Sequence, residues 1–380
     1  MNRVSLLVAC AAGLGLVVLA LACGGRNVSG TNEPAGSPGG AATLSTSPPQ
    51  TPEAVEPLLA DWPEATPGEE SDASTGIVSD VLAKMPPTLL VSDAFIQPGD
   101  TARIPVRLGR GFGSTTFKTY GGYTVAVADA GGKEIHRERT DQDGRLVFEQ
   151  KFEKAGNFFF RAAVDGRVEE KDVRPALFCV YVRAKDAPIA ICDLDKTLVK
   201  SGFFRVVVGG AEPFDHAADV VNRLVKEKRM TVLYLTHRPD FFAASSRHWL
   251  RANRFPPGPL YTGDLAALLT GSGAFKAEEI ARLKQRFANL KLGIGDKYSD
   301  TDAYLENKIR PVLIPDIDWG KKKLEYWQEQ HSQLAALKAD VTVCRDWFEI
   351  EEALFGGKEF PPARLLGPIK DMIQALERGP

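Results

Sequence analysis

The chain has 380 residues, of which 44% are hydrophobic and 25% charged, and its formal net charge is -2. This length suits two folded domains with unstructured connections, and the composition is that of ordinary globular proteins. The near balance of charge excludes a chain that binds nucleic acid or an anionic surface through its overall charge. Charge decides nothing further, and no nucleic-acid partner is expected.

Residues 1–22 have the pattern of a secretory signal peptide. Arg3 gives a positive start, and an apolar run extends from Val4 to Ala22 before a polar stretch. Residues 20–24, ALACG, resemble the lipobox of bacterial lipoproteins, although Ala20 stands where Leu is usual. This resemblance implies lipidation of Cys23 and an exported lipoprotein anchored to a membrane on its periplasmic or cell-surface side. The alternatives are an uncleaved anchor or an ordinary signal peptide.

The next segment, residues 23–76, is rich in Gly, Pro, Ser, Thr, Ala and Glu and has almost no aromatic residues. Such a stretch cannot bury enough apolar surface to offset the entropy lost on ordering. We expect a disordered tether that holds the folded part away from the membrane.

Cys179, Cys192 and Cys344 remain if Cys10 is lost with the signal and Cys23 is lipidated. Three cysteines do not make a disulfide framework, so each is expected to be a small buried hydrophobic residue. An export compartment would still permit one pair.

Residues 87–184 predict an all-β domain. Short apolar or alternating runs are separated by turn signals. They lie at Thr88–Val91, Thr101–Leu108, Tyr123–Ala128, Leu146–Phe152, Asn157–Val164 and Ala176–Val182. Their spacing favours a small antiparallel β-sandwich, and the stretch resembles immunoglobulin-like modules of exported enzymes. Residues 141–144, DQDG, lack the later Glu of a calcium loop and predict a tight turn.

Residues 187–380 show strands that alternate with helical stretches. Strands are expected at Ile189–Cys192, Thr231–Leu235, Leu260–Tyr261, Leu290–Ile294 and Val312–Ile314, and helices near His216–Lys228, Phe241–Asn253, Phe275–Ala288 and Ser299–Lys308. This alternation predicts an α/β fold with a doubly wound parallel sheet, whose site lies at the carboxyl ends of the strands. A helix over Lys321–Ala339, a strand near Val341–Cys344 and a helix near Pro368–Glu377 complete the chain.

Polar residues stand at the ends of three of these strands. Asp193 and Asp195 follow the first, Thr236, His237 and Arg238 end the second, and Asp296 and Asp300 follow the fourth, while Lys276 opens a later helix. Two carboxylates one residue apart repel each other, and a divalent cation such as Mg²⁺ would relieve the repulsion through oxygen ligands. Neither a Ser/His/Asp arrangement nor a zinc spacing is apparent.

Taken in order, Asp-x-Asp-x-Thr, a strand-terminal Thr, a Lys and Gly-Asp-x-x-x-Asp resemble the signature motifs of the haloacid-dehalogenase superfamily. The resemblance implies that Asp193 attacks phosphorus and becomes a phospho-aspartate, and that Asp195 acts as general acid and then as general base. It also implies that Thr236 and Lys276 bind the phosphoryl oxygens. Lys196 departs from the pattern, because many members have Gly in this turn.

The same resemblance implies a Mg²⁺ site. Its ligands would be Asp193, the backbone carbonyl of Asp195, and Asp296, and Asp300 would be a further ligand or would orient Lys276.

Structural alternatives stand beside each role. The aspartates after the first strand and Thr236 could cap helices, and Lys276 could be a solvated surface residue. His237 and Arg238 could bind substrate or could be structural.

Spacing predicts an open site. About forty residues separate Asp195 from Thr236, and about forty separate Thr236 from Lys276, which leaves no room for a full cap domain. An uncapped site suits a large substrate.

A finer resemblance indicates which large substrate this is. Five segments, Tyr234–Pro239, Trp249-Leu250, Gly258–Leu260, Phe275-Lys276 and Gly295–Tyr304, are similar to lipin-type phosphatidate phosphatases, which commonly have Asn where this chain has Asp296. The resemblance spans Ile189–Pro315 and implies phosphatidate or a related phospholipid as substrate.

Three other functions stay open. They are a phosphatase of soluble phosphomonoesters, a non-catalytic sensor that binds phosphatidate and docks a partner through the sandwich, and a structural envelope lipoprotein. The presence of both Asp193 and Asp195 argues against the sensor.

Overall fold

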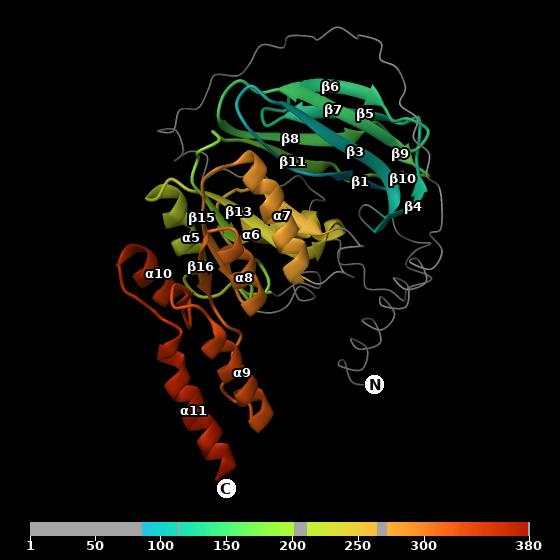
Figure 1. Ribbon diagram of the computed structural model, residues 1–380. Coiled ribbons are helices and arrows are strands. Elements are labelled where there is room, and N and C mark those ends of the chain that lie inside the picture. Colours follow the sequence, from blue (N-terminus) through green and yellow to red (C-terminus); the bar gives the residue numbers. More distant parts are fainter. Residues whose placement is uncertain (1–85, 113–114, 201–210, 264–271, 379–380) are drawn as a thin grey trace, which may run out of the picture. The chain divides into compact units, whose positions relative to one another are not determined.

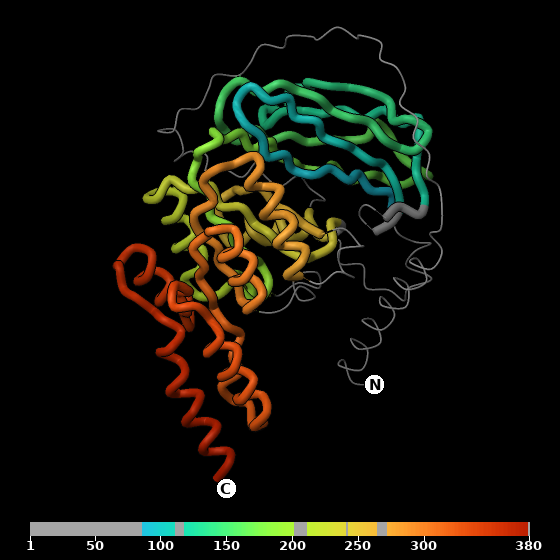
Figure 2. Tube along the Cα trace, viewed as in Figure 1, coloured from blue at the N-terminus to red at the C-terminus, as the bar shows by residue number. Residues whose placement is uncertain are grey.

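The structure, a computed structural model, describes residues 86–112, 115–200, 211–263 and 272–378, and these belong to one compact unit (Figures 1 and 2). The predicted signal peptide, the tether and the lipidation site Cys23 lie outside the described residues. In those ranges no helix is both long and apolar enough to cross a bilayer.

Two β-sheets pack on each other in the first part of the described chain (Figure 1). One contains β1 (Thr88–Val91), β3 (Thr101–Phe112), β4 (Thr115–Thr119) and β7 (Arg145–Lys151). The other has the order β2 (Ala94–Ile96), β11 (Ala176–Val182), β8 (Gly156–Val164), β5 (Thr124–Asp129) and β6 (Glu134–Arg139). Neighbouring strands are antiparallel except for the β2–β11 pair. Inward side chains of both sheets, such as Ile104 and Phe178, form one core, as in a β-sandwich.

All six strands predicted for this part are present. β3 is longer than expected, and β2, β4, β6 and the short pair β9 (Arg167–Val168) and β10 (Lys171–Asp172) were missed. β6 has the sequence EIHRER and lies at a sheet edge, where solvent-facing charged side chains are tolerated. Residues 141–144 form the predicted tight turn, in which the Asp141 carboxylate accepts hydrogen bonds from the Asp143 and Arg145 amides.

The second part is a six-stranded parallel sheet with helices on both faces. Its order is β14 (Leu260–Gly263), β13 (Thr231–Pro239), β12 (Ile189–Cys192), β15 (Leu290–Gly295), β16 (Arg310–Leu313) and β17 (Thr342–Val343). The order reverses between β12 and β15, which places the expected crevice at their carboxyl ends. The α/β prediction is therefore correct.

Alternate residues of β12 face two different cores. Ala190 and Cys192 pack with α5 (Ala217–Lys226) and α6 (Ala243–Ala252), whereas Ile189 and Ile191 pack with α7 (Ser272–Arg286) and α8 (Tyr298–Glu306). Between β12 and α7 the described residues contain α5, η2 (Asp240–Phe242), α6 and strands of the sheet, and they include no cap domain. Cys179, Cys192 and Cys344 are buried free thiols.

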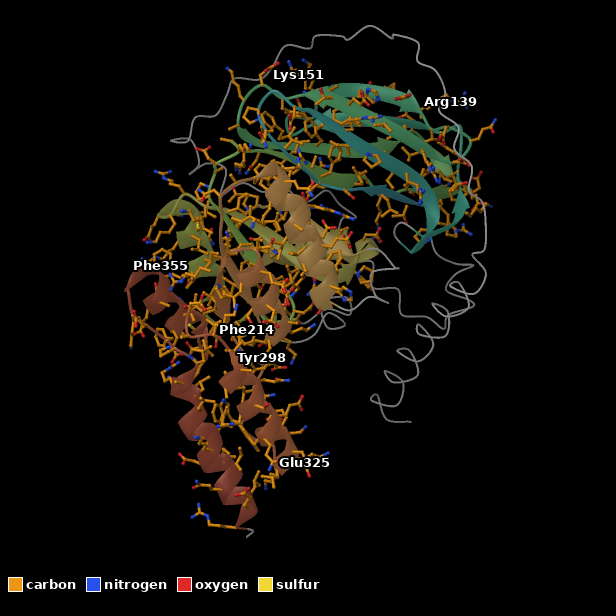
Figure 3. All side chains as sticks on the ribbon, in the orientation of Figure 1. Arg139, Lys151, Phe214, Tyr298, Glu325 and Phe355 are labelled. Carbon is orange, nitrogen blue, oxygen red and sulfur yellow. The ribbon has the colours of Figure 1, made fainter. Side chains whose placement is uncertain are left out.

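The last part of the chain differs from the prediction. After α9 (Leu324–Ala336), the helix α10 (Trp347–Phe355) was missed, and the last helix, α11, begins at Ala363 rather than near Pro368. Pro368 lies inside α11 because buried Leu365 and Ile369 pack in one core with Leu334 of α9, which offsets the lost hydrogen bond. Tyr298, labelled in Figure 3, donates a hydrogen bond from its hydroxyl to Gln330 of α9.

The sandwich and the α/β sheet share buried contacts. The rings of Phe95 in β2 and Phe287 after α7 stack with centroids 4.1 Å apart. Asp93, whose side chain is 1% exposed, lies 3.0 Å from the Arg247 guanidinium of α6 and accepts a hydrogen bond from the Leu260 amide. Burial of the Asp93 charge is offset by this pairing, and the pair joins a residue of the sandwich to a helix of the α/β part.

Candidate active site

Carboxylates meet at the carboxyl ends of β12 and β15. Asp193 follows β12 directly, Asp296 follows β15, and Asp300 lies in the first turn of α8. All three are buried. Asp300 can approach the end of β15 because residue 295 is glycine. A Cβ at this position would lie 2.5 Å from an Asp300 oxygen.

Lys276 extends from α7 into this group of acids. Its Nζ lies 2.9 Å from Asp193 Oδ2 and 2.8 Å from Asp300 Oδ2, and its side chain is 1% exposed. Burial alone would lower the pKa of Lys276, but the charges of Asp193 and Asp300 outweigh burial and raise it. The ammonium group is therefore charged and part of the site, and the surface-lysine alternative is wrong.

One ammonium group does not balance three buried carboxylates. Oxygens of Asp193, Asp296 and Asp300 lie within 4.8 Å of one another. Asp296 Oδ1 and Asp300 Oδ1 are buried and accept no hydrogen bond from the described residues. Burial raises the pKa of Asp296 to about 8, and the charges of Asp193 and Asp300 add to the effect. Unsatisfied, mutually repelling oxygens fit a hard divalent cation such as Mg²⁺.

Asp195 lies apart from this cluster. Its two carboxylate oxygens accept hydrogen bonds of 2.8 and 2.7 Å from Nε and Nη2 of Arg238. The Nη1 of Arg238 donates to the Ser246 hydroxyl at 2.9 Å. Such a bidentate pair fixes the orientation of the carboxylate. The Asp195 carboxylate is thus directed toward Arg238 and not toward the cluster of acids. The metal ligand that the resemblance implies for Asp195 is its backbone carbonyl.

The residues of the second strand motif lie inside β13, which extends to Pro239 rather than ending at Leu235. Thr236 is buried, and its hydroxyl oxygen accepts a hydrogen bond from the Arg238 amide. The rings of His237 and Phe275 pack together, with their centroids 5.6 Å apart. The contacts of the Arg238 guanidinium with Asp195 and Ser246 fix its position and orient the Asp195 carboxylate. Sequence analysis missed Ser246, since nothing in its spacing marks it.

Lys196 lies in the turn after Asp195. Its φ is 60°, in the left-handed region that favours glycine, which is the residue that many similar proteins have here. Its Nζ lies 3.3 Å from Asp316, so the side chain makes an ion pair beside the site.

A comparison with protein families matches one segment of the chain. Residues 190–314 match the family described as PITM 1-3, LNS2 domain, which is related to lipins and to haloacid-dehalogenase-type phosphatases. This segment contains Asp193, Asp195, Thr236, Lys276 and Asp296. No curated protein matched the chain.

Solved structures resemble the chain only weakly. The adhesin InvE of Yersinia pseudotuberculosis is 15% identical over 27% of this chain and 33% of its own, with a TM-score of 0.19. The CARDB domain of the PF1109 protein of Pyrococcus furiosus is 18% identical over 26% of this chain and 96% of that one, also with a TM-score of 0.19. CopC from Methylosinus trichosporium OB3b is 12% identical over 26% of this chain and 96% of its own, with a TM-score of 0.18.

Proposed function

We propose that the chain is a Mg²⁺-dependent phosphomonoester hydrolase that works through a phospho-aspartate on Asp193. The observation that supports this most is the pair of unsatisfied buried oxygens of Asp296 and Asp300 beside Asp193. Native proteins leave few buried oxygens without partners, and here two of them lie on neighbouring acids. When bound, the ion would offset the repulsion between the Asp193 carboxylate and a phosphate group.

The residues of the chain divide the chemistry between them. The Asp193 carboxylate is held at both oxygens, since Oδ1 accepts a hydrogen bond of 2.8 Å from the Leu194 amide and Oδ2 lies 2.9 Å from Lys276 Nζ. One of these oxygens would form a bond to phosphorus while the bond to the substrate oxygen breaks. Asp195 would give its proton to that leaving oxygen and would then take a proton from the water that hydrolyses the phospho-aspartate. Lys276 and Thr236 would hold the phosphoryl oxygens.

We further propose phosphatidate or a related lipid phosphate as the substrate. Two observations support this proposal: the match of residues 190–314 to the LNS2 domain, and the absence of a cap domain from the described residues, which leaves room for a large substrate. An exported chain anchored through a lipidated Cys23, as its N-terminal sequence predicts, would work at a membrane surface.

The test is phosphate release by the full chain in detergent micelles, with and without Mg²⁺. The substrates are phosphatidate in mixed micelles and a small aryl phosphate. Asp193→Asn should abolish turnover, whereas Asp302→Asn, an exposed aspartate of the neighbouring helix α8, should leave it unchanged. Mg²⁺-dependent release that survives in Asp193→Asn would refute the mechanism. A preference for the aryl phosphate would refute the lipid substrate alone.

One observation favours a second candidate, a phosphatidate sensor without catalysis. The bidentate pair with Arg238 occupies both oxygens of Asp195, and an acid held in this way must leave the pair to reach a substrate. Saturable binding of phosphatidate without any phosphate release would establish the sensor in place of the enzyme.

A further inference from the structure

The loop between β16 and α9, residues 314–323, lies at the same edge of the sheet as the carboxylate cluster. Leu313, the last residue of β16, is the register partner of Gly295 at the end of β15. The chain therefore leaves both strands at one edge. Lys196 Nζ lies 3.3 Å from the Asp316 carboxylate of this loop. The loop thus borders the candidate active site.

A tight turn presents Trp319 at the tip of the loop. The Lys321 amide donates a hydrogen bond to the Asp318 carbonyl, and the Asp318 carboxylate accepts one of 3.0 Å from the Gly320 amide. The buried Trp327 of α9 donates from its indole to the Lys321 carbonyl, and its ring centroid lies 5.3 Å from that of Trp319. Trp319 nonetheless remains 43% exposed. The turn therefore has a fixed shape and holds one aromatic ring at the surface.

Three consecutive lysines follow the tip of the turn. They are Lys321, Lys322 and Lys323, all exposed, and their ammonium groups form no ion pair with a described residue. The two acids of the loop are held by other groups, Asp316 by Lys196 and Asp318 by the turn. Glu325, labelled in Figure 3, lies in the first turn of α9, where the helix dipole favours an acid. The lysines are thus free to meet external anions.

An exposed tryptophan beside adjacent lysines suits a lipid–water interface. The indole ring is apolar with one polar N–H, so it is favoured at the level of the lipid headgroups. Lysines near a bilayer are attracted by anionic headgroups. A single exposed apolar residue is ordinary on a protein surface. Here the ring, the lysines and the border of the candidate active site coincide in one loop.

We propose that residues 314–323 form a membrane-contact loop that binds an anionic lipid surface. Trp319 would enter the headgroup region, and the three lysines would contact the headgroups. This contact would turn the carboxyl edge of the sheet toward the bilayer. Its purpose rests on the proposed function, because a lipid phosphatase must bring its site to the surface that holds its substrate. The contact itself needs no turnover.

The test is quenching of tryptophan fluorescence by brominated acyl chains. The full chain is added to preformed vesicles of phosphatidylcholine and phosphatidylglycerol in equal parts. Subtracting the emission of Trp319→Phe isolates Trp319, because the other described tryptophans are buried and Trp62 is common to both chains. The N-terminal segment is also common to all variants, so differences between them report the loop. We expect strong quenching of Trp319 that is largely lost in vesicles of phosphatidylcholine alone.

The lysines set the size of the effect. Each lysine near an anionic surface changes a binding equilibrium by about fivefold. Lys322→Gln should therefore lower the ratio of bound to free loop about fivefold, and replacement of all three lysines by Gln about 100-fold. Lys226→Gln is the matched control, because this exposed lysine ends α5, which leads into the first residue of β13 at the opposite edge of the sheet. It should leave quenching unchanged.

Three results would each overturn the proposal. They are quenching that persists in full in Trp319→Phe, equal quenching of Trp319 in phosphatidylcholine alone, and equal losses in Lys226→Gln and Lys322→Gln. Unchanged thermal unfolding of the lysine variants, whose positions are exposed, would confirm that only binding was altered. Quenching is measured without turnover, so a chain that releases no phosphate would refute the proposed function and leave this test intact.

Discussion

Replacing Lys276 by Met tests the charge balance of the site most directly. The substitution keeps an unbranched side chain but removes the contacts of 2.9 and 2.8 Å to Asp193 and Asp300. Removing one partner of a buried ion pair costs about 3–5 kcal/mol, and native proteins have only about 5–15 kcal/mol of net stability. Because Asp296 would remain as a third buried acid, we expect a loss of at least that size.

Urea unfolding of the full chain measures the loss. Because the free energy of unfolding falls by about 2–3 kcal/mol per M of urea, the midpoint should fall by roughly 1–2.5 M. Mg²⁺ should restore more stability to the variant than to the wild type, because the cation then supplies the missing positive charge. Lys284→Met, on the exposed side of the same helix, is the control and should change the free energy of unfolding by less than about 0.5 kcal/mol. Equal effects of the two substitutions would refute the charge argument.

Three further predictions concern Arg238, Glu349 and Gly258. Arg238→Gln removes both hydrogen bonds that orient Asp195, so kcat for phosphate release should fall about 10- to 100-fold. An unchanged kcat would refute this orienting role, and a raised kcat would show that the pair restrains Asp195 instead. Burial alone would raise the pKa of Glu349, but hydrogen bonds from two arginines lower it from 4.5 to about 2. Its stabilising effect is therefore present above pH 4.5 and lost as the pH falls through about 2, and the difference in unfolding free energy between wild type and Glu349→Gln should shrink over that range rather than stay constant. A Cβ at Gly258 would lie 1.9 Å from a backbone oxygen, so Gly258→Ala should lower the unfolding free energy by about 1–3 kcal/mol, whereas Gly367→Ala, with open space around it, should not lower it.

The sequence was sufficient wherever a short segment carries its own signal. The four-residue strand Ile189–Cys192 is apolar throughout because both of its faces are buried, and it was predicted with its observed bounds. Asp193 and Asp296 were expected at one edge because the ends of parallel strands must meet there. The helix α10 was missed although Asp346 caps it. The start of α11 was predicted too late, near Pro368, because packing between helices overrides the local preference of proline for a helix start.

Contacts between distant segments were decided only by the tertiary structure. Asp195 accepts hydrogen bonds from Arg238, 43 residues later, and Asp93 forms an ion pair with Arg247. No sequence pattern marks the spacing of either pair. Arg107 and Arg145 are opposed because of the register of two antiparallel strands, and a shift of one residue would send one of them to the other face. Sequence alone determined which groups could do chemistry. The order and register of the strands decided which of them are neighbours, because those depend on how whole elements pack rather than on any one segment.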